Sequence, residues 1–515
     1  MIDDPRLGPV PYRADETPRS RVATRALLLA AVVVSVWYFG WLLQPSRIGT
    51  PVLYGLLVAA ELFNLVQACG FWWTASRDTA RRPVQPLPIR RDVDVLIPVY
   101  GEPVDVVEPT VAAATRLRGA RVHVALLDDG DDPAMRALAY RHSVRYIQRH
   151  EHAGAKAGNI NHALRLTDSP YVMVLDCDHV PRPEFLERTL GEFGDPRMAF
   201  VQTPQYYANA AQGGIAAAAW AQQALFFGPI ARGKDELGAM FCAGTNVVFR
   251  RRALEQVEGF PEDSVTEDFK LSIRLHERGW RTAYVPEVLA LGLGPQDMAS
   301  YVSQQLRWSR GCLSAIGTVL RARLPLRLRL QYLLSSMFFL TGWTVLIYMT
   351  LPVVRMLTGA QPLAAATADQ FLLHFAPYFC LALGAVARAG RGRYTFAGFA
   401  LAATTWWVHV LSSLRALTRR PSRFVVTPKR AGSSWQPRAV WPSLVAVCVL
   451  AGSAAYALLG SRSPSALNNA TFAMLHVTIL LSGAAAALRP QRRRREKVAV
   501  EPTTRSLAAH GVRAS

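Results

Sequence analysis

The stretch that decides the fold class of this chain is Tyr171-Val172-Met173-Val174-Leu175-Asp176-Cys177-Asp178-His179. Its short apolar run is typical of a strand that is buried on both faces, and two carboxylates follow that run. Side chains two positions apart in an extended chain point to the same side, so Asp176 and Asp178 can bind one cation together. Their oxygens suit Mg²⁺ or Mn²⁺. Taken alone, the same motif is more often a solvated turn at the end of a strand.

The sequence around this stretch alternates short apolar runs with helical patterns. Val93–Pro98 and Val122–Leu127 predict two further strands, and Val104–Leu117 and Asn159–Leu166 predict helices. Strand–helix alternation predicts a mostly parallel sheet in which ligands bind at the carboxyl ends of the strands. We therefore expect a soluble α/β domain over residues 90–295, with the two carboxylates at its binding edge.

The composition predicts that this domain is attached to a membrane. Of the 515 residues, 51% are hydrophobic, and the formal net charge is +21. Apolar spans with basic loops on their cytoplasmic side explain both values. Nucleic-acid binding would also explain the charge, but the arginines flank the apolar runs instead of covering one domain. The expected partner is therefore a lipid bilayer and not a nucleic acid.

Apolar runs long enough to cross a hydrocarbon core of about 30 Å occur along the chain. They are Val22–Leu43, Ile48–Trp73, Tyr332–Val354, Phe371–Ala387, Val440–Leu459 and Leu467–Leu488. Tyr394–Leu417 is also apolar enough, but arginines at both of its ends favour an interfacial position. The six-span arrangement places both termini and the α/β domain in the cytoplasm.

The expected order of domains follows from these runs. It is a disordered tail at 1–21, two spans in 22–73, the α/β domain in 90–295, interfacial helices in 296–330, two spans in 331–393, an interfacial helix and loop in 394–437, two spans in 438–488 and a basic tail in 489–515.

Polar residues near the predicted binding edge have a functional and a structural interpretation. Asp128 and Asp129 end the second strand, where they can accept hydrogen bonds from a nucleotide base or ribose, although an ordinary Asp-Gly turn is the favoured explanation in isolation. Lys156 opens a helix, where it can bind an anion or only face solvent. The residue types alone do not choose between these interpretations.

Two later motifs are placed on helices. Asp268, in Thr266-Glu267-Asp268, is a candidate general base, while Ser264 and Glu267 also match a capping box with a purely structural role. Gln304, Arg307 and Trp308 share one helix face. Arginine suits a diphosphate and tryptophan suits the flat face of a sugar, but such a pair at a membrane interface is more often an anchor.

In their order and spacing, these motifs resemble those of the processive family 2 glycosyltransferases, and within that group the bacterial cellulose synthase catalytic subunit. Further similar segments are Ile97–Pro103, Lys156–Asn159, Gln202–Pro204 and Phe424–Lys429, of which the last resembles the F-x-V-T-x-K gating loop. Two segments differ from the family pattern. Met240–Thr245 stands in place of its F-F-C-G-S motif, near the expected acceptor sugar, and Gln205–Tyr207 replaces its His-Phe-Phe, so the sugar and the linkage stay open.

The resemblance implies a GT-A-like domain that transfers a sugar with inversion from a UDP-sugar, most often UDP-glucose, to a growing β-glucan that leaves through the plasma membrane. The resemblance implies that the nucleotide is bound by Asp128, Asp129, Lys156, Asp176, Gln304, Arg307, Thr427 and Lys429. It implies that the metal is bound by Asp176 and Asp178 and that catalysis is carried out by Asp268 with Glu267 and Thr266. It implies that the acceptor is bound by Trp308, Cys242 and Gly244.

The resemblance leaves other functions and partners open. A non-processive transferase that adds a sugar to a lipid carrier would use the same nucleotide pocket, and a non-enzymatic membrane scaffold is a second alternative. The resemblance also allows for accessory export proteins as partners. The segment after Leu488 is too short for a PilZ barrel, so we expect no direct control by cyclic-di-GMP through this chain.

Overall fold

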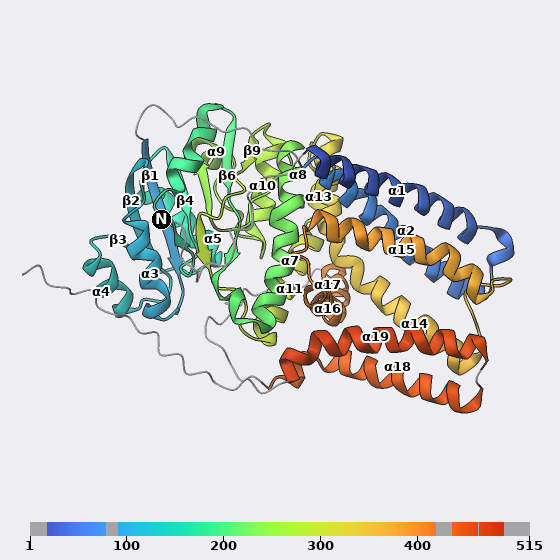
Figure 1. Cartoon of the computed structure of the whole chain (residues 1–515). Coiled ribbons are helices and arrows are strands. Elements are labelled where there is room, and N and C mark those ends of the chain that lie inside the picture. The colour runs from blue at the N-terminus through green and yellow to red at the C-terminus, as the bar shows by residue number, and fades with distance from the viewer. Residues whose placement is uncertain (1–17, 79–90, 419–434, 462, 489–515) are drawn as a thin grey trace, which may run out of the picture.

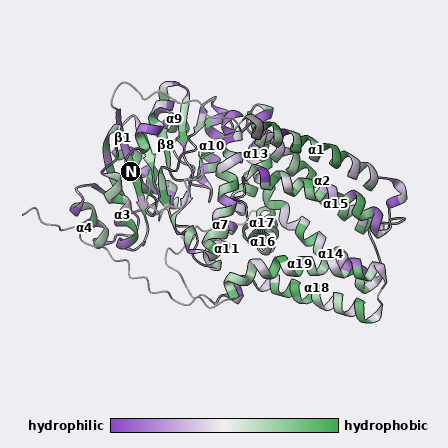
Figure 2. Cartoon of the chain, in the orientation of Figure 1, coloured by the Kyte–Doolittle hydropathy of each residue, from purple (hydrophilic) through white to green (hydrophobic). Residues whose placement is uncertain are grey.

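The computed structural model describes residues 18–78, 91–418, 435–461 and 463–488. An α/β domain lies at one end of a bundle of long helices (Figure 1). Figure 2 shows that the long helices are mostly hydrophobic, whereas the domain mixes polar and apolar segments. The division into a sheet-containing domain and a helical region therefore follows the change in sequence pattern.

The domain is built on a seven-stranded mixed sheet in the order β3-β2-β1-β4-β8-β6-β9. The strands are β1 (Arg91–Val99), β2 (Ala120–Asp128), β3 (Arg145–Gln148), β4 (Tyr171–Val174), β6 (Met198–Gln202), β8 (Val247–Arg250) and β9 (Arg281–Tyr284). β1 runs parallel to β2 and β4, and β8 runs antiparallel to β4 and β6. The predicted α/β fold is confirmed, with β8 as an unpredicted antiparallel strand.

Helices cover both faces of this sheet because its central strands are apolar on both sides. Val95 and Ile97 of β1 pack against α3 (Val104–Ala114) and α4 (Pro133–Arg141). Leu96 of the same strand packs on the other face, against α5 (Ala155–Leu166) and α10 (Glu267–Glu277). The remaining helices of the domain are α6 (Phe185–Thr189), α7 (Gly214–Leu225), α8 (Ala231–Glu236), α9 (Arg251–Gln256) and α11 (Met298–Ser314).

A second, three-stranded sheet lies beside the end of β4. It consists of β5 (Val180–Pro181), β10 (Ala290–Gly292) and β7 (Tyr206–Tyr207), with β10 in the centre. Because β5 follows His179 directly, this sheet fixes the chain that leaves the D-x-D stretch. It also brings Gly292 against the imidazole ring of His179.

A buried ion pair holds β1 to the segment before β4. Arg251 Nη2 donates to Asp94 Oδ2 at 2.7 Å, and Arg251 Nε donates to the Ser169 carbonyl at 2.6 Å. Ser169 in turn donates to Asp94 from its backbone N–H and its hydroxyl. Each charge is therefore paired and hydrogen-bonded, which is the condition under which buried charges are tolerated.

We expect Arg251→Met to destabilise the protein by about 3–5 kcal/mol, because the Asp94 carboxylate is then buried without its cation. Arg252→Met is the matched control, since Arg252 is exposed on the same helix. Thermal unfolding of the two purified variants in detergent measures the difference. Equal melting temperatures for both variants would contradict this role of the ion pair.

Among the residues that the structure describes, six helical segments are long and apolar enough to cross a membrane: Val22–Leu42, Pro51–Ala75, Leu326–Thr358, Asp369–Ala389, Trp441–Gly460 and Pro464–Leu488. They contain α1 (Pro18–Leu42), α2 (Pro51–Ala75), α13 (Leu326–Met337), α14 (Thr341–Thr358), α15 (Ala368–Ala389), α18 (Trp441–Gly460) and α19 (Pro464–Leu488). The chain is a multi-pass membrane protein. The third segment begins earlier than predicted, since α13 continues into α14.

The segment predicted to lie at the interface forms two short helices, α16 (Phe396–Thr404) and α17 (Trp406–Leu417). The helix is interrupted at Thr405, and neither half is among the candidate spans. α16 packs against α7 and α19, and α17 packs against α11 and α14. The pair therefore lies between the α/β domain and the spans (Figure 1).

Candidate active site

A cavity of about 680 Å³ opens at the carboxyl ends of β1 and β4. It is the position that an open α/β sheet offers to a ligand. The predicted site residues that line it are Asp129, Lys156, Asp176, Asp178, Gly244, Thr266, Glu267, Asp268, Gln304, Arg307 and Trp308. Thr427 and Lys429 lie outside the described residues. The structure thus brings together motifs that are far apart in the sequence, from Asp129 to Trp308.

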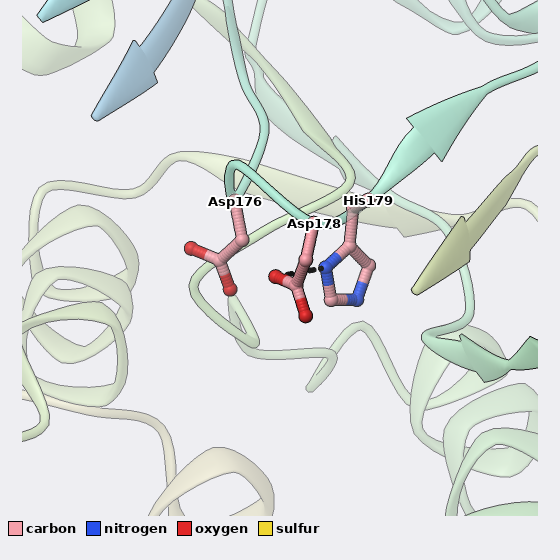
Figure 3. A group of neighbouring side chains, drawn as sticks. All are labelled: Asp176, Asp178 and His179. Carbon is pink, nitrogen blue, oxygen red and sulfur yellow. Dashed lines mark hydrogen bonds and ion pairs between the residues drawn. The ribbon is translucent and has the colours of Figure 1, made fainter. Parts of the chain in front are cut away.

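Asp176, Asp178 and His179 form a compact group directly after β4 (Figure 3). Each offers a ligand atom, and these atoms all lie within 4.8 Å of one another. The sequence analysis assumed that an extended chain brings Asp176 and Asp178 together, but the chain is not extended at this point. The chain turns here, with the His179 N–H donating to the Asp176 carbonyl at 2.9 Å.

His179 is a candidate ligand that the sequence analysis did not predict. Its Nδ1 lies 3.3 Å from Asp178 Oδ1. Its Nε2 is buried and has no hydrogen-bond partner among the described residues. Gly292 makes room for the ring, since a Cβ atom there would overlap the imidazole. Two carboxylates and an imidazole suit a divalent cation, so the group of Asp176, Asp178 and His179 can hold one.

We expect His179→Ala to weaken Mn²⁺ binding by about 10–100-fold, the range found when a group that supports a metal site is removed. Titration of the purified protein with Mn²⁺ in the presence of UDP measures the effect. His123→Ala serves as the control because His123 is exposed on β2, away from the cavity. Unchanged affinity in the His179 variant would mean that the imidazole does not contribute to the metal site.

Lys156 joins the two sides of the cavity. Its Nζ donates to Asp176 Oδ1 at 2.5 Å and to the Gly244 carbonyl at 2.8 Å. Burial lowers the pKa of the amine, but the carboxylates of Asp176, Glu267 and Asp268 outweigh it and raise the pKa overall. Lys156 is therefore a permanent cation inside the cavity and can bind an anionic ligand.

Asp268 lies in the first turn of α10 and faces the loop that carries Gly244. Its Oδ1 accepts a hydrogen bond from the Phe269 N–H at 2.8 Å. Gly244 has φ +84°, and a Cβ atom there would lie 2.9 Å from Asp268 Oδ2. Burial, and then the Glu267 carboxylate, raise the pKa of Asp268 to about 7. A carboxylate with this pKa can accept a proton near neutral pH.

The predicted capping box of α10 is wrong. Thr266 occupies the N-cap position, and Ser264 Oγ accepts a hydrogen bond from the Thr266 N–H at 3.3 Å. The start of α10 is held instead by Ser272, which donates to the Asp268 carbonyl and accepts from the Cys242 N–H, both at 2.8 Å. Cys242 is buried behind the cavity and does not line it, so its predicted contact with the acceptor has to be corrected.

The two aspartates of Asp-Asp-Gly have different positions. Asp128 is fully buried, and its carboxylate accepts hydrogen bonds from the Gly130 N–H, the Asp132 N–H and the Tyr146 hydroxyl. It does not line the cavity. The prediction that Asp128 contacts a nucleotide is therefore corrected to a role in holding the loop. Asp129 is the residue of the pair that lines the cavity.

Arg149 positions Asp129 and was not predicted from the sequence. Its Nε lies 2.5 Å from Asp129 Oδ1, and its Nη2 lies 2.6 Å from Asp129 Oδ2. The guanidinium also donates to the carbonyls of Ala153 and Ala155, at the start of α5. This two-pronged pair fixes the plane of the Asp129 carboxylate. The sequence did place Arg149 directly after a short strand, β3, where it could have been recognised as a site residue. The strand itself was missed because its composition is mixed.

Gln304, Arg307 and Trp308 reach the cavity from α11, a helix that packs against α13 and α17. Asp297 caps this helix by accepting from the Ser300 N–H at 2.8 Å. The hydroxyls of Ser309 and Ser412 lie 2.6 Å apart and join α11 to α17. Trp308 lines the cavity, as the acceptor interpretation requires.

Comparison of structures defines the class of fold. The mannosyltransferase PcManGT from Pyrobaculum calidifontis, solved in complex with GDP-Man and Mn²⁺, superposes with a TM-score of 0.53 at 16% identity. The match covers 72% of this chain and 100% of that chain. The α/β domain therefore has a GT-A-like glycosyltransferase fold.

Comparison of sequences defines the family. Residues 171–387 match the model of glycosyl transferase family group 2. Cellulose synthase 2 of Novacetimonas hansenii is 31% identical over 459 residues, which are 84% of this chain and 28% of that protein. The cellulose synthase catalytic subunit (UDP-forming) of Xanthomonas axonopodis pv. citri (strain 306) is 35% identical over 344 residues, which are 62% and 46% of the two chains.

This chain belongs to the cellulose-synthase-like family 2 glycosyltransferases. It spans less than half the length of the two relatives described above.

Proposed function

We propose that this protein is an inverting, processive glycosyltransferase that polymerises a β-linked glucan from UDP-glucose and moves it across the plasma membrane. The observation that carries the proposal is one cavity in which a candidate metal group, a carboxylate able to accept a proton and an arginine–tryptophan face meet. The similarity to cellulose synthases supports glucose as the sugar.

The nucleotide end of the donor binds between β1 and α5. Asp129, held by Arg149, accepts hydrogen bonds from the uridine, and Lys156 contributes positive charge. Arg307, with Gln304 beside it, binds the diphosphate from the opposite wall. A divalent cation held by Asp176, Asp178 and His179, Mg²⁺ or Mn²⁺, would neutralise the diphosphate as UDP leaves.

Asp268 acts as the general base. It takes the proton of the acceptor hydroxyl as the hydroxyl oxygen attacks the anomeric carbon, while the bond from that carbon to the UDP oxygen breaks. Attack from the face opposite UDP inverts the anomeric centre. The pKa of about 7 suits this step, because the carboxylate is then largely ionised at neutral pH and still basic enough to take the proton.

Processive synthesis requires that the acceptor stays bound after each transfer. Trp308 presents a flat ring at the cavity wall nearest the spans, where the terminal sugar of the polymer can stack. α11 continues into α12 (Ile316–Arg321) and α13, and so links this wall to the third span. We therefore place the exit of the polymer among the spans beside α11.

The proposed orientation puts the α/β domain in the cytoplasm. The connections α1–α2, α14–α15 and α18–α19 lie at the end of the bundle away from the domain (Figure 1). The α1–α2 and α14–α15 connections are joined by a hydrogen bond, in which the Gly49 N–H donates to the Pro362 carbonyl at 3.0 Å. Arginines such as Arg388 and Arg415 lie toward the domain, as the positive-inside rule expects of the cytoplasmic side.

We expect a cysteine at Thr418 to be protected from impermeant thiol reagents in intact cells and to react after permeabilisation, because α16 and α17 stay on the cytoplasmic side. A cysteine at Ser461, between α18 and α19, should react in intact cells. Both are placed in a background without the exposed Cys69, Cys380 and Cys448. Labelling of the Thr418 position in intact cells would contradict the six-span orientation.

The experiment that tests the function is synthesis by membranes that contain this protein. Labelled UDP-glucose and other labelled UDP-sugars are supplied, and the product is sized and its linkages are determined. The proposal predicts a long β-glucan from UDP-glucose. A short, lipid-soluble product would favour the alternative, a transferase that adds one sugar to a lipid carrier. No transfer from any donor would favour a scaffold.

A further inference from the structure

Gly311 lies on the face of α11 that also carries Gln304, Arg307 and Trp308, three residues beyond the tryptophan. A Cβ atom at this position would come 2.8 Å from Thr266 Cβ, and closer still to the methyl and hydroxyl of Thr266. Carbon atoms in van der Waals contact lie about 3.5–4.0 Å apart. The bare backbone of α11 is therefore what contacts the start of α10.

Helix propensity does not explain a glycine here. Gly311 is buried in the interior of a 17-residue helix, where alanine is the stronger helix former. Its φ is not positive, so no special backbone conformation requires glycine. The remaining reason is space, and Thr266 is the residue that fills it.

A second glycine, Gly244, also lies against the start of α10. A side chain on Gly244 would meet the Asp268 carboxylate, as described above. Two glycine backbones therefore contact the start of α10, Gly244 at Asp268 and Gly311 of α11 at Thr266. Thr266 Oγ1 is buried at this contact and has no hydrogen-bond partner among the described residues. Its position is thus set by packing.

We propose that Gly311 is a positioning residue for the transfer reaction. By letting α11 rest directly on Thr266, it sets the separation between Asp268, two residues further along α10, and the Arg307–Trp308 face. The base and the acceptor wall are then held by one helix–helix contact. This inference depends on the proposed function, in which Asp268 takes the proton of an acceptor that rests on Trp308.

The test is Gly311→Ala in the full-length enzyme, measured by polymer synthesis from labelled UDP-glucose and by UDP titration. We expect turnover to fall by about 10²-fold, as when reacting groups are displaced by about 1 Å. UDP affinity should fall far less than turnover, because Asp129 and Lys156 are not moved and only the Arg307 contact shifts with α11. Gly317→Ala is the control, since a Cβ atom there comes no closer than 3.5 Å to any other group.

Thr266→Gly combined with Gly311→Ala distinguishes positioning from general packing. Glycine removes the Cβ, hydroxyl and methyl of Thr266, which are the three atoms that the alanine would overlap, so the double variant should recover turnover relative to Gly311→Ala alone. The same rescue applies to folding if the single variant does not insert into the membrane. Wild-type turnover in Gly311→Ala, or a double variant no better than the single one, would overturn the proposal.

The wild-type assay alone tests the proposed function, and the ratio of variant to wild type tests the role of Gly311. If the wild type makes no polymer, the proposed function fails. The wild type and the Gly311→Ala variant are then compared in hydrolysis of the donor. Slower hydrolysis by the variant would support positioning of Asp268, and equal rates of hydrolysis would overturn it.

Discussion

Asp268→Asn is expected to lower the rate of sugar transfer by about 10²–10⁴-fold, the contribution of a positioned general base. The amide keeps the size of the carboxylate and can still accept from the Phe269 N–H, so α10 should begin as before. UDP affinity should stay near the wild-type value, because the nucleotide is held by other residues. Initial rates and UDP titrations of the purified variant measure both quantities.

Asp263→Asn is the matched control, since Asp263 is an exposed aspartate just before α10 that pairs with Lys270. It should leave the rate unchanged within about two-fold. If Asp268→Asn retained wild-type turnover, Asp268 would not be the base. An equal loss in both variants would indicate damage to the start of α10 and not to the chemistry.

The pH profile gives an independent view of the same group. Burial and the Glu267 carboxylate raise the pKa of Asp268 to about 7, so the carboxyl is protonated below that pH and cannot take a proton. Turnover should therefore rise with pH through about 7. An aspartate with its ordinary pKa would place this rise near pH 4. A rate that is flat between pH 5 and 8 would contradict the assignment.

Trp308→Ala is expected to stop elongation while the protein remains folded and binds UDP. Stacking of a ring on an aromatic side chain is worth about 1–3 kcal/mol by analogy with base stacking. The loss recurs at every added sugar, so its effect on product length is larger than on a single transfer. Product length, UDP affinity and expression are measured for Trp308→Ala and Trp308→Tyr side by side, with the tyrosine variant expected to keep partial elongation.

Trp441→Ala is the control for a tryptophan that acts at the membrane surface. Trp441 begins α18 and is 60% exposed, outside the cavity. Its loss should lower expression or thermal stability without shortening the product. Full-length polymer from Trp308→Ala would mean that Trp308 is an anchor as well, and the proposal of processive synthesis would lose its main support.

The parts of the fold that could be predicted are those in which one apolar pattern dominates. β1, β2 and β4 are continuous apolar runs, and the spans are long ones, so both were recognised. β3 and β8 were missed because Arg145–Gln148 and Val247–Arg250 are short runs that contain arginine, whereas β4, which is equally short, is apolar throughout and is followed by the D-x-D motif. Nothing in the local sequence indicates that β8 is antiparallel.

The candidate site was predictable as a set of motifs but not as a set of contacts. Residue type alone predicted nucleotide binding equally for Asp128 and Asp129. Only the turn geometry shows that the Asp128 carboxylate already accepts hydrogen bonds from the N–H groups of Gly130 and Asp132. Arg149 and His179 act through partners brought together by folding. Their roles depend on Asp129 being next to β3 and on Gly292 being next to the D-x-D turn, which are long-range contacts that a local pattern cannot show.

The measurement that tests the central claim most directly is the size of the product made by the purified protein in liposomes from UDP-glucose, early in the reaction. If the chain is a processive glucan synthase, long β-glucan should appear while most enzyme molecules have started few chains, and a chelator of divalent cations should stop its formation. Products that lengthen by one sugar at a time across the whole population, or that carry a single sugar on a lipid, would contradict the claim.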